Sequence, residues 1–329
     1  MKAILINFHW MKNFLNQARR RLTLKQMRGF AAIVEHGTIT GAAAAIGVTP
    51  PAILHQLREI EDSFGLPLLE RSNGVAIPTE AGREILAAIA RIETEIGDCL
   101  DAIAALAGMQ RGHVAIGVIS TAKYFAPSAL AAFKRAHPEI DLRLLVGNRG
   151  ETVAALERFD IDLAIMGRPP EHFEVTEVAI GTHPHVIIAA PEHPLAGRAA
   201  IPPAALLDQP FLLREPGSGT RALVQRVFES AGLDPAGGME FGSNETIKQA
   251  VIAGMGIALI SAHTIAAEWA DRRIAILDVV GLPILRQWYL VRRREKRLLP
   301  ASRALWEHLV RDGGTFLPRI DLPGGIPGG

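Results

Sequence analysis

The stretch from Leu24 to Thr79 constrains the fold most, because its apolar spacing predicts three short helices followed by a hairpin. The expected elements are a first helix, an Ala-rich second helix, a third helix and a two-stranded wing, at Leu24–Glu35, Gly41–Ile46, Pro50–Phe64 and Leu66–Ile77. Thr23 and Gln26 form a capping box for the first helix, and Thr40 and Thr49 are the expected caps of the next two. This order predicts a winged helix-turn-helix, which places its third helix in the DNA major groove.

The third helix has an apolar stripe and an opposite face suited to DNA. The stripe comprises Ile53, Leu57, Ile60 and Phe64. With an arginine of the wing, the candidate DNA-binding residues are Thr49, Pro50, Pro51, Leu54, His55, Arg58 and Arg71. Net charge is only +1, so positive charge is local, in the run Arg19, Arg20, Arg21, Lys25 and Arg28. That run is either a solvated face or a set of phosphate contacts.

A long helix is predicted from Glu80 to about Ala107, with Thr79 as its cap. Its apolar residues follow a heptad spacing, namely Ile85, Ile89, Ile92, Ile96, Cys99, Ile103 and Leu106. The stripe predicts a homodimer through this linker helix, although it could instead pack on its own domain. Cys99 is the single cysteine, which excludes a disulfide within the chain and suits a reducing cytoplasm. At a seam position it is expected to act as a small apolar side chain.

From His113 onward, strands and helices alternate, which predicts parallel sheets covered by helices. Separate strands are expected at Val175–Ile180 and Val186–Ala190. Two such sets predict two lobes, connected near Gly181-Thr182 and Val280–Pro283. The expected segments are an N-terminal extension at 1–21, the DNA-binding domain at 22–79, the linker helix at 80–107, the α/β domain at 112–312 and a disordered tail at 313–329. Within the α/β domain, lobe 1 comprises 112–181 and 283–312, and lobe 2 comprises 182–282.

Residues 1–21 place an Arg triplet after a short apolar stretch, which is the wrong order for a secretory signal. The segment is either an added helix or the product of a start codon placed too far upstream. No apolar run reaches about 18 residues, so no membrane span is expected. The chain is therefore predicted to be cytoplasmic.

Four loops that follow strands are the expected ligand site, because open α/β sheets bind ligands at the carboxyl ends of their strands. The strongest signal is Glu215–Arg221, where glycines and hydroxyls open a helix whose N-terminus favours an anion. The alternative is a plain Gly-rich turn. The candidate ligand-binding residues are Ser120, Thr121, Lys123, Asn148, Arg149, Glu151, Ser218, Gly219, Thr220, Arg221, Asn244 and Thr246. Lys248 either joins them or faces solvent.

Signals for catalysis, metal binding and cofactors are weak. Gly217–Gly219 is not a nucleophile elbow, and Gly254–Gly256 lacks the third glycine of a dinucleotide fingerprint. His183, His185 and His193 have no carboxylate at zinc-ligand spacing. We therefore expect no catalytic residue, no metal and no cofactor.

The sequence GTITGAAAAIGVTPPAILHQLREIEDSFGLPLLERS resembles the DNA-binding domain of LysR-type transcriptional regulators. It departs from many relatives at Pro50 and at Leu54-His55, where they carry Gln and Ser-Arg. REPGSGTR, LVGNRGE and GSNETIKQAV are similar to segments of the regulators of carbon-fixation (RuBisCO and Calvin-cycle) operons. The resemblance covers about residues 22–312 and implies a multidomain fold, in which a winged helix-turn-helix and a linker helix precede a two-lobed, periplasmic-binding-protein-like effector domain.

The same resemblance implies double-stranded operator DNA and a small anionic effector as partners. The implied effectors are sugar phosphates such as ribulose bisphosphate, phosphoenolpyruvate and NADPH. It also implies a homodimer, assembled further into a homotetramer. Three alternatives stay open: a LysR-type regulator of another operon with a carboxylate effector, a solute-binding receptor, and an enzyme on the same two-lobed fold such as porphobilinogen deaminase. The missing export signal argues against the receptor, and the missing nucleophile against the enzyme.

Overall fold

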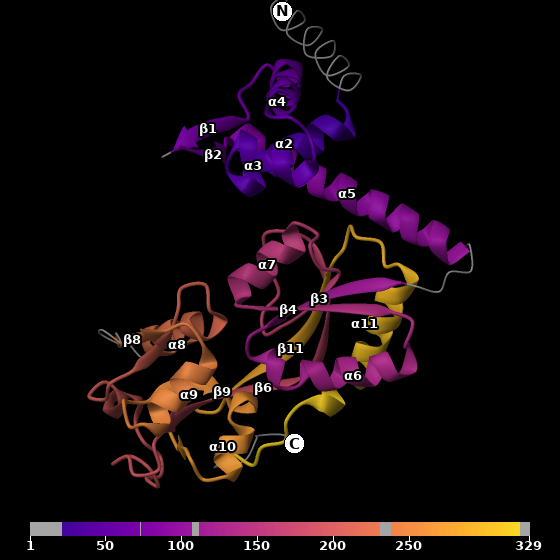
Figure 1. The fold of residues 1–329 in the computed structure, drawn as a ribbon. Helices are drawn as coiled ribbons and strands as arrows, with labels where there is room; N and C mark the ends of the chain where they lie inside the picture. Colours follow the sequence, from indigo (N-terminus) through magenta and orange to yellow (C-terminus); the bar gives the residue numbers. More distant parts are fainter. Residues whose placement is uncertain (1–21, 73, 107–111, 231–237, 323–329) are drawn as a thin grey trace, which may run out of the picture. The chain divides into compact units, whose positions relative to one another are not determined.

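The structure, a computed structural model, describes residues 22–72, 74–106, 112–230 and 238–322 (Figure 1). It divides into two compact units, residues 1–97 and 98–329. The N-terminal extension at 1–21, with Arg19 to Arg21, lies outside the described residues. No helix in the described ranges is long and apolar enough to cross a bilayer.

The first unit contains the predicted helices and wing. Its elements are α2 (Leu24–His36), α3 (Ile39–Ile46), α4 (Pro50–Phe64), β1 (Leu69–Ser72), β2 (Val75–Pro78) and most of the long α5 (Glu80–Leu106), whose last residues belong to the second unit. The capping box of Thr23 and Gln26 is present, and Gly37 ends α2 in the left-handed conformation. The sequence therefore predicted the first helix to within one residue at its C-terminus.

Two expected helix caps differ from the structure. The helix α3 begins at Ile39 rather than Gly41, because Thr38, not Thr40, accepts a hydrogen bond from the Gly41 amide at 3.0 Å. Thr49 is the N-cap of α4, but its side chain caps nothing. Pro50 and Pro51 have no N–H to offer it, and the Ala52 amide donates to the Thr49 carbonyl instead.

The core of the first unit joins the three helices to the start of α5. Its fully buried side chains are Phe30, Ile33, Ile53, Ile60 and Leu68. Ile89 of α5 is 5% exposed and belongs to the same core, with Ile85 packed beside it. The first half of the heptad stripe therefore packs on its own domain. Further along α5, Leu100 and Ile103 are 62% and 56% exposed, so the second half is uncovered.

The second unit contains a seven-stranded sheet in the order β10-β6-β11-β5-β3-β4, with β9 paired to β6. A two-stranded pair, β7 and β8, continues it beside β9 through an isolated bridge. The strands are β3 (His113–Ile119), β4 (Asp141–Gly147), β5 (Leu163–Met166), β6 (Val175–Ala189), β7 (Leu212–Arg214), β8 (Met239–Phe241), β9 (Ala258–Ser261), β10 (Ala275–Leu277) and β11 (Ile284–Arg293). The helices are α6 (Ala126–Ala136), α7 (Arg149–Glu157), α8 (Gly219–Ser230), α9 (Asn244–Ile252), α10 (Ala266–Ala270) and α11 (Pro300–Asp312), with short 3-10 turns η1 (Ala122–Tyr124), η2 (Pro203–Leu206), η3 (Ala262–Thr264) and η4 (Gly313–Phe316).

The prediction of parallel sheets holds for only some of the strand pairs. The strand β3 is parallel to β4 and β5, and β7 is parallel to β8, but β6 and β11 are antiparallel to their neighbours. These two strands run side by side in opposite directions, each passing once between the lobes. The two separate strands expected at 175–180 and 186–190 are one strand, β6, because residues 181–185 stay extended and paired with β11.

The change of lobe occurs at an irregularity in this ladder, where Trp288 pairs with Gly181 and Tyr289 pairs with Ala179. Trp288 and Ile180 belong to the core of the first lobe, whereas Ile284 packs on the second. The first crossing is therefore close to Gly181. The second lies later in the chain than the predicted Val280–Pro283.

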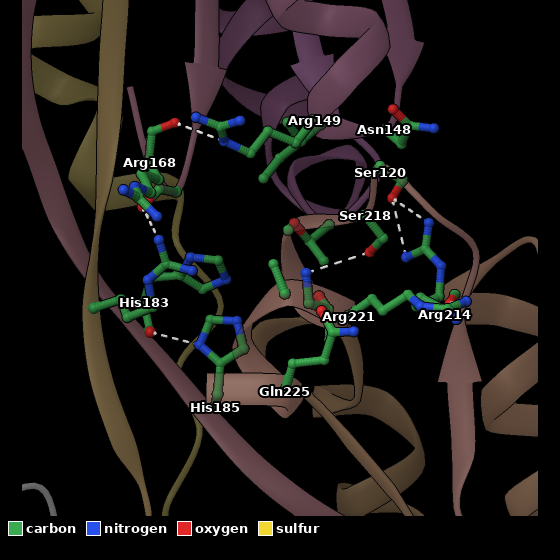
Figure 2. A pocket seen from close by; sticks show the side chains of 18 of the residues that line it. Ser120, Asn148, Arg149, Arg168, His183, His185, Arg214, Ser218, Arg221 and Gln225 are labelled. Carbon is green, nitrogen blue, oxygen red and sulfur yellow. Dashed lines mark hydrogen bonds between the residues drawn. The ribbon is translucent and has the colours of Figure 1, made fainter. Parts of the chain in front are cut away.

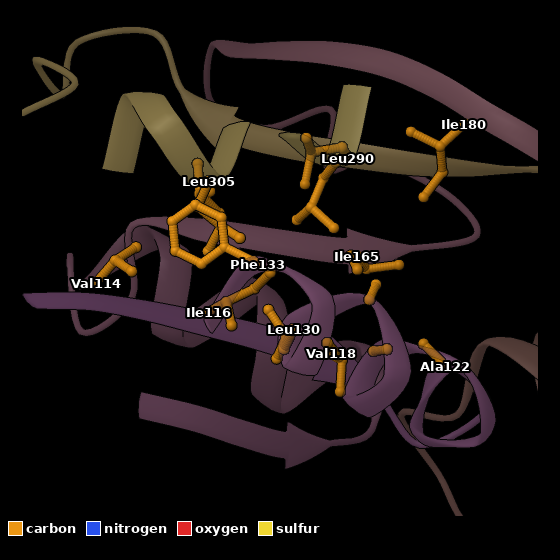
Figure 3. Packing of buried hydrophobic residues seen from close by; sticks show 14 of the residues in the cluster. Val114, Ile116, Val118, Ala122, Leu130, Phe133, Ile165, Ile180, Leu290 and Leu305 are labelled. Atoms are coloured by element: carbon orange, nitrogen blue, oxygen red, sulfur yellow. The ribbon is translucent and has the colours of Figure 1, made fainter. Parts of the chain in front are cut away.

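Two helices cover one face of the first-lobe sheet (Figure 3). Val114, Ile116 and Val118 of β3 pack against α6 and α11, which contribute side chains such as Phe133 and Leu305. The helix α7 covers the other face through Val153 and other buried side chains. Successive side chains of β3 and β5 point to opposite faces of the sheet, and helices cover both faces. Both strands are therefore continuous runs of apolar residues.

The predicted disordered tail at 313–329 is wrong for residues 313–322, which are ordered. Gly314 packs so tightly that an added Cβ would lie 2.5 Å from the Ile180 carbonyl oxygen. Leu322 is 8% exposed in the second-lobe core, and the Trp269 indole donates to the Asp321 carbonyl at 3.2 Å. The predicted disorder of residues 323–329 lies outside the described residues.

Two glycines of α5 provide a matched test of the packing of the first unit. A Cβ at Gly82 would lie 2.2 Å from the Leu68 carbonyl oxygen, whereas a Cβ at Gly97 would meet no atom within 4 Å. We expect Gly82→Ala to lower the free energy of unfolding by about 1–3 kcal/mol through overpacking. Gly97→Ala should raise it by up to about 1 kcal/mol through helix propensity. Calorimetric unfolding of the full chain measures both; equal effects would contradict the close approach.

Candidate functional site

The exposed face of α4 carries the predicted DNA-binding residues. Thr49, Pro50, Pro51, Leu54, His55 and Arg58 are all exposed, while Ile53, Leu57 and Ile60 are buried beneath them. The His55 ring is 72% exposed and lies 3.4 Å from Glu59 on the next turn. Arg71 lies on β1, but its side chain is outside the described part of the chain. The first turns of one helix thus expose all six of these residues on the side away from the core.

One arginine of the expected basic run has another role. Arg28 of α2 binds Glu93 of α5 through two hydrogen bonds, at 2.6 and 2.8 Å. This bidentate pair lowers the pKa of Glu93. Arg28 therefore joins two helices of the first unit and has its charge neutralised there.

The second unit contains a cavity of about 420 Å³ where the strand-end loops meet the crossing strands (Figure 2). Its lining includes the predicted residues Ser120, Thr121, Asn148, Arg149, Ser218, Gly219, Thr220 and Arg221. It also includes residues that the sequence analysis missed, namely Arg168, His183, His185, Arg214, Gln225, Arg226 and Arg286. Three of the four predicted loops and both crossing strands therefore converge on one pocket.

The loop that opens α8 forms one wall. Gly217 has a φ of +86°, which favours glycine, and its carbonyl accepts a hydrogen bond from the Gly150 amide at 3.3 Å. Ser218 and Thr220 are 5% and 7% exposed, and both face the cavity. Buried hydroxyls at the start of a helix suit an anion, because main-chain amides and the helix dipole also favour negative charge there.

Arginines without carboxylate partners form another wall. Arg149 donates to the main-chain oxygens of Arg168 and Pro169, both at 3.2 Å. Arg286 donates to the Gly167 oxygen at 2.8 Å. Burial lowers the pKa of both guanidinium groups, and repulsion from Arg168 and Arg226 lowers it further. Since Glu171 pairs with Arg168 alone by hydrogen bonds, this wall has excess positive charge.

Arg214 and Arg221 are held differently. Arg214 is 3% exposed, forms a bidentate pair with Glu215 at 2.6 and 2.7 Å, and also donates to Ser120 and Asn244. Arg221 donates to Glu240 and to the Arg214 carbonyl. A carboxylate thus already neutralises each of these two charges. The predicted bidentate contact of Arg221 with the ligand therefore has less support than a contact from Arg149, which has no hydrogen-bonded carboxylate among the described residues.

Four predicted ligand residues do not line the cavity. Lys123 lies over the Tyr124 ring, with its ammonium 5.2 Å from the ring centroid. Glu151 completes the capping box of Asn148 at the start of α7, and Thr246 bonds Ser243 at the start of α9. Asn244 bonds two lining residues, Arg214 and Ser120, without lining the cavity itself. These polar groups form hydrogen bonds with helix N-termini or with neighbouring side chains. Their position after a strand does not by itself distinguish such a role from contact with a ligand.

Lys248, for which solvent exposure was one alternative, is 2% exposed. Its ammonium pairs with Glu268 at 2.5 Å and Glu245 at 3.0 Å.

Two of the cavity residues that the sequence analysis missed had a usable signal. Arg168 follows β5 and Arg214 ends β7, so the rule that ligands bind at the carboxyl ends of strands predicts both. In the described part of the chain, no group of three or more His, Cys, Asp or Glu side chains could hold a metal ion.

Two family models match the chain. Residues 24–83 match the bacterial regulatory helix-turn-helix protein, lysR family, and residues 107–313 match the LysR substrate binding domain. The chain is 51% identical to the HTH-type transcriptional regulator CbbR of Xanthobacter flavus over 308 residues, covering 93% of this chain and 92% of that protein. It is 42% identical to the RuBisCO operon transcriptional regulator of Allochromatium vinosum, covering 91% and 99% of the two chains.

A similar solved structure is that of the Synechocystis PCC6803 CcmR regulatory domain in complex with 2-PG. Its TM-score is 0.59 and its sequence identity is 38%, covering 61% of this chain and 97% of that domain.

Proposed function

This chain belongs to the LysR family of bacterial transcriptional regulators, whose role is DNA binding rather than catalysis, and we propose that it controls a carbon-fixation operon in response to a small phosphorylated anion. The proposed effector site is the cavity of the second unit. The proposed DNA site is the exposed face of α4 together with Arg71 of the wing.

The effector proposal rests on cavity arginines that have no hydrogen-bonded carboxylate among the described residues. The hydrogen bonds of Arg149 and Arg286 go to neutral main-chain oxygens, so among the described residues no carboxylate is hydrogen-bonded to either guanidinium group. Bringing like charges together in a partly buried wall is costly unless an anion neutralises them. Guanidinium groups match phosphate oxygens in geometry and charge. The Ser218 and Thr220 wall supplies hydroxyls for the same ligand.

The choice of a phosphorylated effector and a carbon-fixation operon rests on similarity. The relatives named for CbbR and for the RuBisCO operon match over most of the chain, so the likeness includes both the α4 face and the cavity. CcmR, whose regulatory domain is similar, was solved with 2-PG, a small molecule bearing phosphate and carboxylate. A carboxylate effector is the alternative that the same arginines could accept.

We propose a mechanism in which effector binding shifts the balance between two arrangements of the lobes, as in periplasmic binding proteins. The strands β6 and β11 carry the crossing within the sheet, and residues 313–322 also run from the first-lobe core to the second. Bending of the two strands at Gly181 and Trp288 would let the lobes change angle. A homodimer through the exposed half of α5, further paired into a tetramer, would convert that change into altered spacing or bending of operator DNA.

Arg149→Gln should weaken binding of 2-phosphoglycolate about 10- to 100-fold, because a hydrogen bond to a charged group contributes about 1.5–3 kcal/mol. Arg221→Gln should lose less, since Glu240 already neutralises Arg221. Arg303→Gln on α11, an exposed arginine outside the cavity, is the matched control. Titration calorimetry on the full chain measures all three. Wild-type affinity in Arg149→Gln would remove the arginine wall from the site.

Arg58→Gln should weaken binding to all DNA sequences similarly, because we expect a phosphate contact from this exposed position on α4. The slope of log K against log salt should fall by about one. Fluorescence anisotropy at several salt concentrations, on a fragment selected by the wild-type protein from random DNA, measures the slope. The Arg303→Gln control should leave it unchanged. If Arg58→Gln also leaves the slope unchanged, Arg58 does not contact phosphate.

Ile103→Asp should dissociate the dimer, because it puts a charge into the exposed apolar half of α5. Ala87→Asp introduces the same charge on the opposite side of the same helix, about 160° away by helix periodicity, and should leave the dimer intact. Sedimentation velocity separates the two outcomes. A stable dimer in Ile103→Asp would show that the contact between subunits lies elsewhere.

A further inference from the structure

His183 is a buried polar side chain on the cavity wall whose ring has no hydrogen-bond partner. It projects from β6 and is 2% exposed. Within the described residues, neither of its ring nitrogens contacts a donor or acceptor. Leaving a buried polar group unpaired costs about 1–3 kcal/mol, so such groups are exceptions that call for a functional explanation.

The ring is held in place by apolar stacking. Trp288 stacks on it with ring centroids 3.7 Å apart and planes 16° from parallel. The His185 ring is 4.2 Å away, and a Cβ added at Gly167 would lie 3.0 Å from Nδ1 of His183. The neighbouring histidines are satisfied: His185 bonds the His183 carbonyl at 3.1 Å, and His263 accepts from the Trp288 indole at 3.0 Å. His183 is the histidine of this cluster whose hydrogen-bonding capacity is unused.

The charged groups around His183 are positive. Arg286 pairs with it directly across the β6–β11 ladder, and Arg149 and Arg168 line the same cavity. The carboxylate at this wall, Glu171, is bound to Arg168. Burial, followed by repulsion from His185, His263 and Arg286, holds the pKa of His183 well below its usual value. The ring is therefore neutral at physiological pH, and one nitrogen keeps a free lone pair.

We propose that His183 contacts the effector directly and takes up one proton as the anion binds. The proton comes from solvent and adds to the free ring nitrogen. The new N–H then donates to an oxygen of the ligand. Figure 2 shows His183 and His185 together on one side of the cavity, with Ser120 and Arg214 across from them. A ligand that spans this width would meet the Ser120 hydroxyl at one end and the imidazole at the other.

The direction of the pH dependence follows from the charges. A dianion beside His183 replaces repulsion with attraction, so the pKa of the ring is higher in the complex than in the free protein. Between those two values, each binding event consumes a proton. Affinity should therefore increase as pH falls, by up to tenfold per pH unit for one linked proton, and should decline as pH rises through the pKa of the complex.

This inference rests on the proposed function, since it requires that the cavity bind a phosphorylated anion. The test uses the full chain and three probes: 2-phosphoglycolate, phosphoenolpyruvate and ribulose bisphosphate. Titration calorimetry in buffers of different ionisation enthalpy counts the protons taken up per ligand, and repetition from pH 6 to 8.5 gives the slope of affinity. The ligand phosphate also titrates near pH 6, but it contributes equally to every variant.

His183→Asn keeps a polar side chain but cannot titrate, and His172→Asn changes an exposed histidine of the same unit as a control. We expect His183→Asn to bind with about one proton fewer and a flatter pH profile, while His172→Asn matches the wild type. Nitrogen-15 NMR of the wild-type imidazoles, with and without probe, reports the same protonation without relying on the folding of a variant.

Two results would overturn the inference in different ways. If a probe binds and the His183 ring stays neutral in the NMR spectrum, with proton uptake equal in wild type and His183→Asn, then His183 is not the proton acceptor and the proposed effector class survives. If none of the three probes binds, both the role of His183 and the phosphorylated effector are wrong.

Discussion

The antiparallel pairing of β6 with β11 is the constraint on which the second unit depends. One ladder carries the chain out of the first lobe and back again, and it supplies a core residue to that lobe through Trp288. The same ladder places His183 and Arg286 opposite each other on the cavity wall. The same two strands therefore connect the lobes and line the cavity. A change in how these strands bend cannot leave the cavity unchanged, because the cavity wall is part of them.

The cavity keeps a positive charge because some of its arginines bind main-chain oxygens rather than carboxylates. Where a guanidinium has a carboxylate beside it, as Arg214 has Glu215, its position is fixed and its charge is cancelled. Where main-chain oxygens fix it, as for Arg149, the position is held and the charge is kept. The second arrangement weakens the protein in isolation, since like charges repel and burial disfavours them. Binding sites commonly trade stability in this way for readiness to receive an opposite charge.

Local signals predicted the first unit and much of the second. Caps, periodicity and turn residues gave the helices of the DNA-binding domain to within two residues, since those features act between near neighbours. The strand-end rule found the loops at Ser120, Asn148 and Ser218 for the same reason. It could not find Arg286 or His183, which approach the site only through long-range strand pairing. Nor could it foresee that Lys248 is buried against Glu268, twenty residues away, or that residues 313–322 complete a core. Contacts of that kind are set by the tertiary fold rather than by local spacing.

The junction between the wing and α5 has a mechanical consequence. Thr79 bonds Pro67 and Gly82, Gly82 lies against Leu68, and Ile89 is sunk in the domain core. The Arg28–Glu93 pair then adds a contact about one turn beyond Ile89. These contacts fix the first part of the long helix to the domain. A rotation of α5 about its axis would therefore turn the exposed face of α4 with it.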